Sequence, residues 1–137
     1  LMKKGAPLAK ITQTIFGNNN IGALKLWGRA FEKAHFNEKN GMLVTAITRK
    51  DVEECQASVE DIYQVTSILS AVPDAKFALV LSQRDDDTIR ASLRSMEQHG
   101  VDVSSIAHQF GGGGHKLASG FEIQGKLVET ATGFMVA

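Results

Sequence analysis

An eight-residue apolar run, Gly41–Thr48, constrains the fold of this chain more than any other segment. It contains β-branched residues, and its length is typical of a strand rather than of a helix. A strand that is apolar without alternation is buried on both faces, so it lies in a sheet that is covered on both sides. The run therefore predicts an α/β architecture.

Two helical patterns precede this run. Apolar side chains at spacings of three and four residues predict one helix over residues 7–16, with Pro7 in its first turn. A second helix is predicted from about Ile21 to Phe36, followed by a turn at Asn37–Gly41. The buried stripe expected on the second helix comprises Leu24, Trp27, Phe31 and Ala34.

Two more helices are predicted after the run. Asp51 opens a short helix that includes Cys55, and Ser58 begins a longer helix that ends near Ser70. Asp61 stands three residues after Ser58, in the position that completes a capping box. The apolar residues expected to be buried on the longer helix are Val59, Ile62, Val65, Ile68 and Leu69.

The second half of the chain supplies further strands. Lys76–Leu81 and the alternating segment Thr88–Ser95 are predicted strands, joined by a hairpin turn at Arg84–Asp87. The elements expected after them are a short helix at Val103–Phe110, helical turns at His115–Ser119, a strand at Phe121–Ile123 and a terminal helix at Lys126–Val136. This order predicts an α/β fold in which a mixed sheet of about four to five strands is flanked by helices, with a helical N-terminal segment.

The short helix is followed by four consecutive glycines: Gly111, Gly112, Gly113 and Gly114. Glycine has no side chain, so a ligand can approach the backbone closely, and successive N–H groups in such a turn bind anions. A helix beginning behind the run would add its positive end, His115 a ring N–H and Lys116 a mobile charge. A passive glycine-rich connection is the alternative, but the run has no Ser, Pro or Asn padding. We therefore predict a phosphate-binding loop.

The alternating strand offers a second anion-binding element. Arg90, Ser92 and Arg94 are spaced by two residues, so their side chains point to one face of the sheet. Arg donates through a forked guanidinium and Ser through its hydroxyl, which suits a phosphate or a carboxylate. A solvated strand face is the alternative. It is the favoured interpretation for Arg90, whereas Ser92 and Arg94 are assigned to the site.

Composition limits how such a site can work. The chain has 15 basic and 15 acidic side chains, so it does not carry the strongly basic surface of a long-strand nucleic-acid binder, and anion recognition must be local. A single cysteine, Cys55, excludes an internal disulfide and is typical of a reducing compartment. No apolar run approaches the roughly 20 residues of a membrane span. We expect a cytoplasmic location and no membrane partner.

The segment Ile106–Phe121, with Ala91–Ser95 and Val101–Ser104 before it, closely resembles the C-terminal DHH-associated domain of the DHH phosphoesterase family. The resemblance is nearest to the bacterial oligoribonucleases and 3′-phosphoadenosine 5′-phosphate phosphatases, the nano-RNases, and some relatives have RecJ-like or exopolyphosphatase-related names. It covers essentially the whole chain. Residues 1–36 resemble a helical linker from a missing catalytic DHH domain, and residues 37–137 resemble the associated substrate-binding domain.

The resemblance implies a division of labour. In the family, the N-terminal domain binds two manganese ions (Mn²⁺) through Asp and His ligands that include an Asp-His-His triplet, and the C-terminal domain closes over the substrate. Carried over to this chain, the glycines, His115 and Lys116 contact substrate phosphate, and Arg94 with Ser92 orients the same end. The implied partners are a nucleotide or short RNA substrate and the DHH domain of the same polypeptide. Because relatives often dimerise, a homodimer stays open.

The chain departs from the family pattern at the metal site. It has no Asp-His-His triplet, and its histidines lack acidic residues at metal-ligand spacing. The adjacent carboxylates at Asp85–Asp87 point in different directions on a turn. We therefore expect a piece of a longer polypeptide that binds no metal and is inactive alone. The full-length protein is expected to hydrolyse short oligoribonucleotides, with 3′-phosphoadenosine 5′-phosphate as a further candidate substrate.

Three alternatives stay open. A cyclic dinucleotide phosphodiesterase and a RecJ-like single-strand exonuclease use a similar glycine–His loop. The third is a stand-alone nucleic-acid-binding module. Zero net charge, one tryptophan and one tyrosine argue against the binding of long strands, which needs a basic groove and stacking aromatic side chains.

Overall fold

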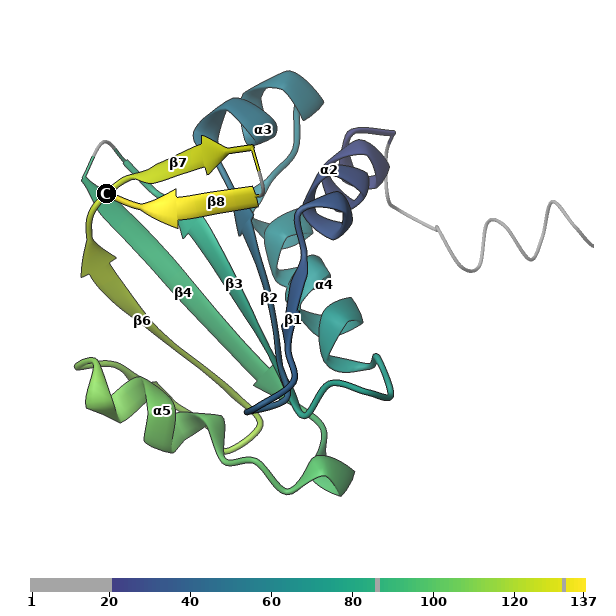
Figure 1. The fold of residues 1–137 in the computed structure, drawn as a ribbon. Coiled ribbons are helices and arrows are strands. Elements are labelled where there is room, and N and C mark those ends of the chain that lie inside the picture. Colours follow the sequence, from purple (N-terminus) through teal and green to yellow (C-terminus); the bar gives the residue numbers. More distant parts are fainter. Residues whose placement is uncertain (1–20, 86, 132) are drawn as a thin grey trace, which may run out of the picture.

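The computed structural model describes residues 21–85, 87–131 and 133–137. Its centre is a six-stranded mixed sheet in the order β1-β2-β3-β4-β6-β5, and a second, two-stranded sheet pairs β7 with β8 (Figure 1). The strands are β1 (His35–Asn37), β2 (Met42–Ile47), β3 (Phe77–Gln83), β4 (Thr88–Ser95), β5 (Gly113–Gly114), β6 (Ala118–Gln124), β7 (Leu127–Thr130) and β8 (Gly133–Val136). The helices are α2 (Ile21–Glu32), α3 (Arg49–Cys55), α4 (Val59–Ser70) and α5 (Val103–Gln109), with a 3-10 turn η1 (Glu97–His99).

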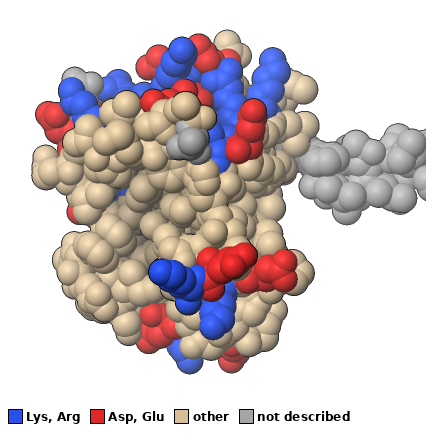
Figure 2. Space-filling model, viewed as in Figure 1, with Lys and Arg blue, Asp and Glu red and all other residues tan. Residues whose placement is uncertain are grey.

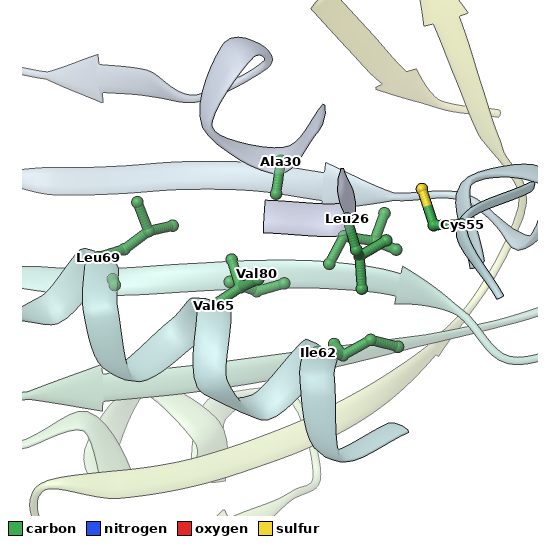
Figure 3. Packing of buried hydrophobic residues seen from close by; sticks show 9 residues of the cluster. Leu26, Ala30, Cys55, Ile62, Val65, Leu69 and Val80 are labelled. Carbon is green, nitrogen blue, oxygen red and sulfur yellow. The ribbon is translucent and has the colours of Figure 1, made fainter. Parts of the chain in front are cut away.

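Two apolar clusters lie on opposite faces of the large sheet, because successive strand residues point to opposite sides. On one face, Leu26 of α2 and Val65 of α4 pack with Val80 of β3 (Figure 3). On the other face, Leu93 of β4 packs in one cluster with Ala107 of α5. The sheet is therefore covered on both sides, and the predicted α/β fold is confirmed.

Strand β2 corresponds to the apolar run. It pairs in parallel with β3, and the connection that parallel pairing requires is made by α3 and α4. Ile47 belongs to the cluster beneath α2 and α4, and Ala46 to the cluster beneath α5, so this end of the strand is buried on both faces as predicted. Residues 42–44 are only half-buried, because their neighbour on one side is the short edge strand β1, which has three residues.

The buried stripe of α2 differs from the predicted one by one position. The buried residues are Gly22, Ala23, Leu26 and Ala30. Phe31 is 39% exposed, and Trp27 lies at the margin, where its Nε1 donates to the Asp61 carbonyl at 3.3 Å. Small residues face the sheet because they let the helix backbone come close. The Thr45 hydroxyl donates to the Ala30 carbonyl at 2.5 Å.

Side-chain caps fix where α3 and α4 begin. Thr48 caps α3, so this helix begins at Arg49, two residues before the predicted start, and Asp51 is its third residue. The Asp51 carboxylate accepts the Thr48 N–H at 3.0 Å, and the Thr48 hydroxyl accepts the Asp51 N–H at 3.1 Å. The capping box predicted for α4 is confirmed. Of the residues expected to be buried on α4, two are exposed instead: Val59 and Ile68.

The chain after the glycines is extended where helices were predicted. His115 and Ala118 exchange backbone hydrogen bonds of 2.8 and 3.2 Å in a hairpin between β5 and β6, so the helical turns predicted at His115–Ser119 are wrong. The terminal helix predicted at Lys126–Val136 is also wrong, because these residues form the β7–β8 hairpin. Gly133 has φ +148°, which a right-handed helix excludes.

The strand count is slightly higher than predicted, because the short edge strands β1 and β5 bring the large sheet to six strands. The helix predicted over residues 7–16 lies outside the described residues. The division of the chain at residue 36 into a linker and an associated domain stays a prediction. No helix in the described ranges has the length and apolarity needed to cross a membrane.

An ion-pair cluster ties α2 and α3 to β7. Asp51, which is 4% exposed, accepts from Lys33 Nζ at 2.5 Å and from Arg29 Nη1 at 3.2 Å. Arg29 also contacts Glu54 at 2.7 Å, and Lys33 contacts Glu129 at 3.5 Å. Burial on its own raises the pKa of Asp51. Hydrogen bonds from Lys33, from the Thr48 backbone and from Arg29 outweigh burial and hold that pKa below its ordinary value.

We expect Asp51→Asn to lower the free energy of unfolding by about 2 kcal/mol near neutral pH, because it weakens the capping box and leaves Lys33 without its buried partner. The pKa of Asp51 is lower in the folded than in the unfolded state. Its contribution is therefore present above the unfolded-state pKa of about 3.9 and is lost as the pH falls through the folded-state pKa.

Urea unfolding at about pH 7 and about pH 3 measures this contribution, and the difference between variant and parent should shrink at the lower pH. Glu53→Gln, at an exposed position of the same helix, is the control and should change stability by less than about 0.5 kcal/mol. An equal loss at both pH values would contradict the assignment.

Candidate functional site

Strand β4 divides its side chains between the two faces of the sheet. Its apolar residues enter the cluster beneath α5: Ile89, Ala91 and Leu93. Arg90, Ser92 and Arg94 alternate with them and lie on the opposite face, against which α4 packs. The side chains predicted to share a face therefore do so.

A row of small residues crosses the sheet at Ser92. In the antiparallel register, Ser92 pairs with Gly120 of β6, and Gly120 pairs with Gly113 of β5. Arg90 and Arg94 stand two positions to either side of Ser92 on the same strand. The surface of the sheet is therefore low between two guanidinium-bearing side chains.

This low surface forms a hollow of about 290 Å³, which we call the β4–β6 hollow. It is lined by Tyr63, Thr66, Arg90, Ser92, Leu93, Arg94, Gly113, Gly114, Ala118, Ser119 and Gly120. The structure thus brings together Ser92, Arg94 and two of the four glycines predicted for the site. It adds Arg90, for which the sequence favoured a solvated face.

The Arg90 guanidinium lies against Gly120. A Cβ atom at Gly120 would lie 2.7 Å from Arg90 Nη2 and 2.7 Å from the Ala91 carbonyl oxygen, so a larger residue does not fit there. Arg90 Nε is buried and has no hydrogen-bond partner among the described residues. A buried donor without a partner costs about 1–3 kcal/mol.

The charged residues that line the hollow are both basic, Arg90 and Arg94. None of its lining residues is acidic, and within the described ranges neither Arg90 nor Arg94 forms an ion pair. Figure 2 views the molecule from the side of α5 and the β7–β8 hairpin, where acidic and basic side chains gather together toward two ends and leave a mostly uncharged band between them. The nearest acidic residue in the strand register is Glu122, which pairs with Arg90 across β4 and β6 but does not line the hollow.

The first two glycines of the run close the end of α5. Gly111 has φ +83°, and its N–H donates to the His108 carbonyl at 3.2 Å. The Gly112 N–H donates to the Ala107 carbonyl at 2.9 Å, and a Cβ atom at Gly112 would lie 2.1 Å from the Gly120 carbonyl oxygen. Both N–H groups are therefore engaged within the protein, and Gly112 is required for close packing on β6.

The last two glycines form the edge strand β5. His115 and Ala118 exchange both backbone hydrogen bonds, so Gly114 and Ser119 are the non-hydrogen-bonded pair of the antiparallel ladder. The Gly114 N–H consequently points away from β6, at the open edge of the hollow. Gly114 has φ +144°, and a Cβ atom there would lie 2.6 Å from Ser119 Cα.

His115 and Lys116 lie at the tip of the β5–β6 hairpin. Both are exposed, and neither lines the hollow. Because a strand rather than a helix follows them, no helix N-terminus stands behind the glycines, and the expected contribution of a helix dipole is wrong. Phosphate contacts from these two side chains stay a prediction.

Besides Arg90, sequence reasoning missed six residues of the hollow, among them Tyr63, Thr66 and Gly120. Tyr63 and Thr66 come from α4, and no sequence motif connects that helix to the glycine run. Gly120 did carry a signal, because an isolated glycine inside a strand indicates a close approach of neighbouring atoms. The guanidinium of Arg90 is such a neighbour.

The described residues include no group of three or more His, Cys, Asp or Glu that could hold a metal ion. Asp85, the first carboxylate of the acidic turn, accepts the backbone N–H of Asp87 at 3.0 Å and that of Thr88 at 2.9 Å. The bond from Asp87, with those from Thr88, holds the pKa of Asp85 below its ordinary value. This carboxylate therefore shapes the β3–β4 turn.

Comparison with known proteins places this geometry in a family. The family model of the DHHA1 domain matches residues 39–135. The chain belongs to the DHHA1 domain family. It is 32% identical over 92 residues to the bifunctional oligoribonuclease and PAP phosphatase NrnA of Mycoplasma genitalium, and 29% identical over 103 residues to the protein of the same name from Bacillus subtilis. The alignments cover 67% and 75% of this chain but 28% and 31% of those proteins, so the chain spans about three tenths of their length.

Solved structures share the DHHA1 fold. An exopolyphosphatase-related protein from Bacteroides fragilis matches with a TM-score of 0.69 at 22% identity, over 88% of this chain and 35% of that one. PggH, a pGpG-specific phosphodiesterase from Vibrio cholerae, matches with a TM-score of 0.51 at 11% identity, over 86% of this chain and 35% of that one. The resemblance to the associated domain of DHH phosphoesterases is confirmed.

The contact between Arg90 and Gly120 makes a testable prediction. Gly120→Ala should lower the free energy of unfolding by about 1–3 kcal/mol, because the new methyl group meets the guanidinium and a backbone carbonyl. Gly28→Ala is the control. Nothing lies within 4 Å of a Cβ atom at Gly28, and alanine in the exposed interior of α2 should raise stability by about 0.5–1 kcal/mol. Urea unfolding measures the stability of both variants. An unchanged free energy of unfolding for Gly120→Ala would show that the hollow is not preformed.

Proposed function

We propose that this chain is the substrate-binding domain of a metal-dependent phosphoesterase, and that the β4–β6 hollow binds a phosphate of the substrate nucleotide. The observation that carries the proposal is the pair Arg90 and Arg94 on either side of a floor without bulky side chains. Phosphate is recognised by the forked donors of Arg. The Ser92 hydroxyl is a further donor in the same hollow, and the Gly114 N–H is one at its open edge.

For the full-length protein we propose the hydrolysis of short oligoribonucleotides, with 3′-phosphoadenosine 5′-phosphate as a second substrate. The names of the two curated relatives support this choice. The size of the hollow also favours a short ligand, because about 290 Å³ is at the lower end of small-molecule sites. A cyclic dinucleotide phosphodiesterase or a RecJ-like exonuclease would use the same phosphate contacts. Competition by short RNA, cyclic dinucleotide and single-stranded DNA ranks the three.

We propose that the metal belongs to another part of the polypeptide. The described residues do not fit a metal ion, so no metal-dependent step is assigned to them. In this proposal, a DHH domain of the same protein binds two Mn²⁺ ions and supplies the hydrolytic chemistry. The described domain contributes binding and orientation of the phosphate.

Arg94→Ala should weaken the binding of a 5′-phosphorylated diribonucleotide about tenfold to a hundredfold, since a hydrogen bond to a charged group contributes about 1.5–3 kcal/mol. Arg94→Lys should restore part of the affinity, because lysine keeps the charge but lacks the fork. Isothermal titration calorimetry of the chain measures both. Lys25→Ala removes an exposed charge of α2 outside the hollow and should leave the affinity within about twofold.

Two additions complete this experiment. His115→Ala should weaken binding, because His115 is predicted to contact phosphate. It should leave thermal stability unchanged, because the side chain is exposed at the hairpin tip. A salt titration separates the domain from a stand-alone nucleic-acid-binding module, because one terminal phosphate gives a slope of about −1 and a long strand gives a much steeper one. A steep slope with long RNA, together with an unchanged Arg94→Ala variant, would contradict the proposal.

The chain alone should not hydrolyse a labelled diribonucleotide in the presence of Mn²⁺, because the described residues include no metal-binding group. Product formation is measured by chromatography, with the longer protein that contains both domains as the positive control. Hydrolysis by the chain that stops on addition of a chelator would move the active site into this domain.

A further inference from the structure

Tyr63 occupies an unusual position for a large aromatic side chain. It lies on α4, one helical turn before Thr66, and both residues line the β4–β6 hollow. Thr66 is 4% exposed, whereas Tyr63 is 46% exposed. The residues with which it lines the hollow include the small residues Ser92 and Gly120 of the sheet.

The Tyr63 ring is also held in place at its polar end. Arg84 Nη2, from the segment that follows β3, donates to the Tyr63 hydroxyl at 3.1 Å. An aromatic side chain has only two rotatable bonds, so this hydrogen bond and the helix backbone together restrict the plane of the ring. The ring is thus an oriented aromatic surface at the side of the hollow.

We infer that Tyr63 is a nucleobase-stacking residue, so that the hollow binds the phosphate and the base of one nucleotide together. The inference rests on the proposed function, because it requires a phosphate held by Arg90 and Arg94. Those cations lie on β4, while Tyr63 lines the hollow from α4. A planar base attached to the bound phosphate can stack on the exposed ring, and such stacking is sequence-tolerant because every base has a π-face.

The ligand class follows from this arrangement. A volume of about 290 Å³ and a single aromatic ring in the lining suit one nucleotide unit. Inorganic polyphosphate and sugar phosphates offer nothing to stack on Tyr63. The domain therefore distinguishes nucleotides from other phosphate esters through α4, and it binds the phosphate through β4.

The test compares a nucleotide with a ligand that lacks the base. Binding of adenosine 5′-monophosphate and of ribose 5-phosphate to the chain is measured for the parent, Tyr63→Ala, Tyr63→Phe and Arg94→Ala. Tyr63→Ala should weaken the nucleotide about tenfold, as expected for the loss of one stacked base, and leave ribose 5-phosphate unchanged. Tyr63→Phe keeps the ring and should stay within about threefold of the parent. Arg94→Ala should weaken both ligands.

Nuclear magnetic resonance gives a readout that does not depend on a variant. The chain contains 1 tyrosine, so its ring signals are assignable, and contacts between base protons and the Tyr63 ring are expected on addition of the nucleotide. Equal weakening of both ligands by Tyr63→Ala, or no contact to the ring, would overturn the stacking role and leave the phosphate site intact. Failure of the parent to bind either ligand would overturn the proposed function itself.

Discussion

The alternation of side chains along β4 is the constraint on which the rest of the structure depends. The odd-numbered residues from 89 to 93 enter the apolar cluster beneath α5. The even-numbered residues from 90 to 94 line the β4–β6 hollow and include its two arginines. A shift of one residue in the register of β4 would bury Arg90 and Arg94 in that cluster and expose its apolar partners. The pairing of β4 with β3 and with β6 therefore fixes the core and the candidate site in one step.

The glycine run shows how one motif serves two purposes. Gly111 and Gly112 end α5 and let it pack closely on β6, whereas Gly113 and Gly114 continue as an edge strand that borders the hollow. The sequence predicted a loop with all its N–H groups available to an anion. In the structure, the N–H groups of the first two glycines are already hydrogen-bonded within the protein. In the proposed site, the edge of β5 is the part of the run that remains for a ligand, and Arg90 and Arg94 take the place of the expected helix dipole as the source of positive charge.

The sequence predicted those elements whose signal is local. Strand β4 was predicted at its observed bounds because Thr88–Ser95 alternates cleanly, and Ser58 with Asp61 identified the start of α4. The terminal hairpin was mistaken for a helix because its apolar spacing fits either structure, and the φ of Gly133 that decides between them is not visible in a sequence. Within the hollow, Ser92 and Arg94 could be predicted to share a face, because they lie two residues apart on one strand. The contribution of Tyr63 could not be predicted, because it depends on the tertiary packing of α4 against β3 and β4.

Zero net charge and a local anion site are compatible because of where the carboxylates are. In the cluster of α2, α3 and β7, three carboxylates are paired with three cations, so their charges cancel at short range: Asp51, Glu54 and Glu129 with Arg29, Lys33 and Lys50. No acidic side chain of the described residues lines the hollow, so two cations over a low floor are the charges nearest to a ligand there, with Glu122 beside Arg90 on the next strand. Surface charges more than about 10 Å apart are largely screened at moderate salt. What the domain presents to an anion is therefore decided by this neighbourhood, and the balanced total of the chain has little influence on it.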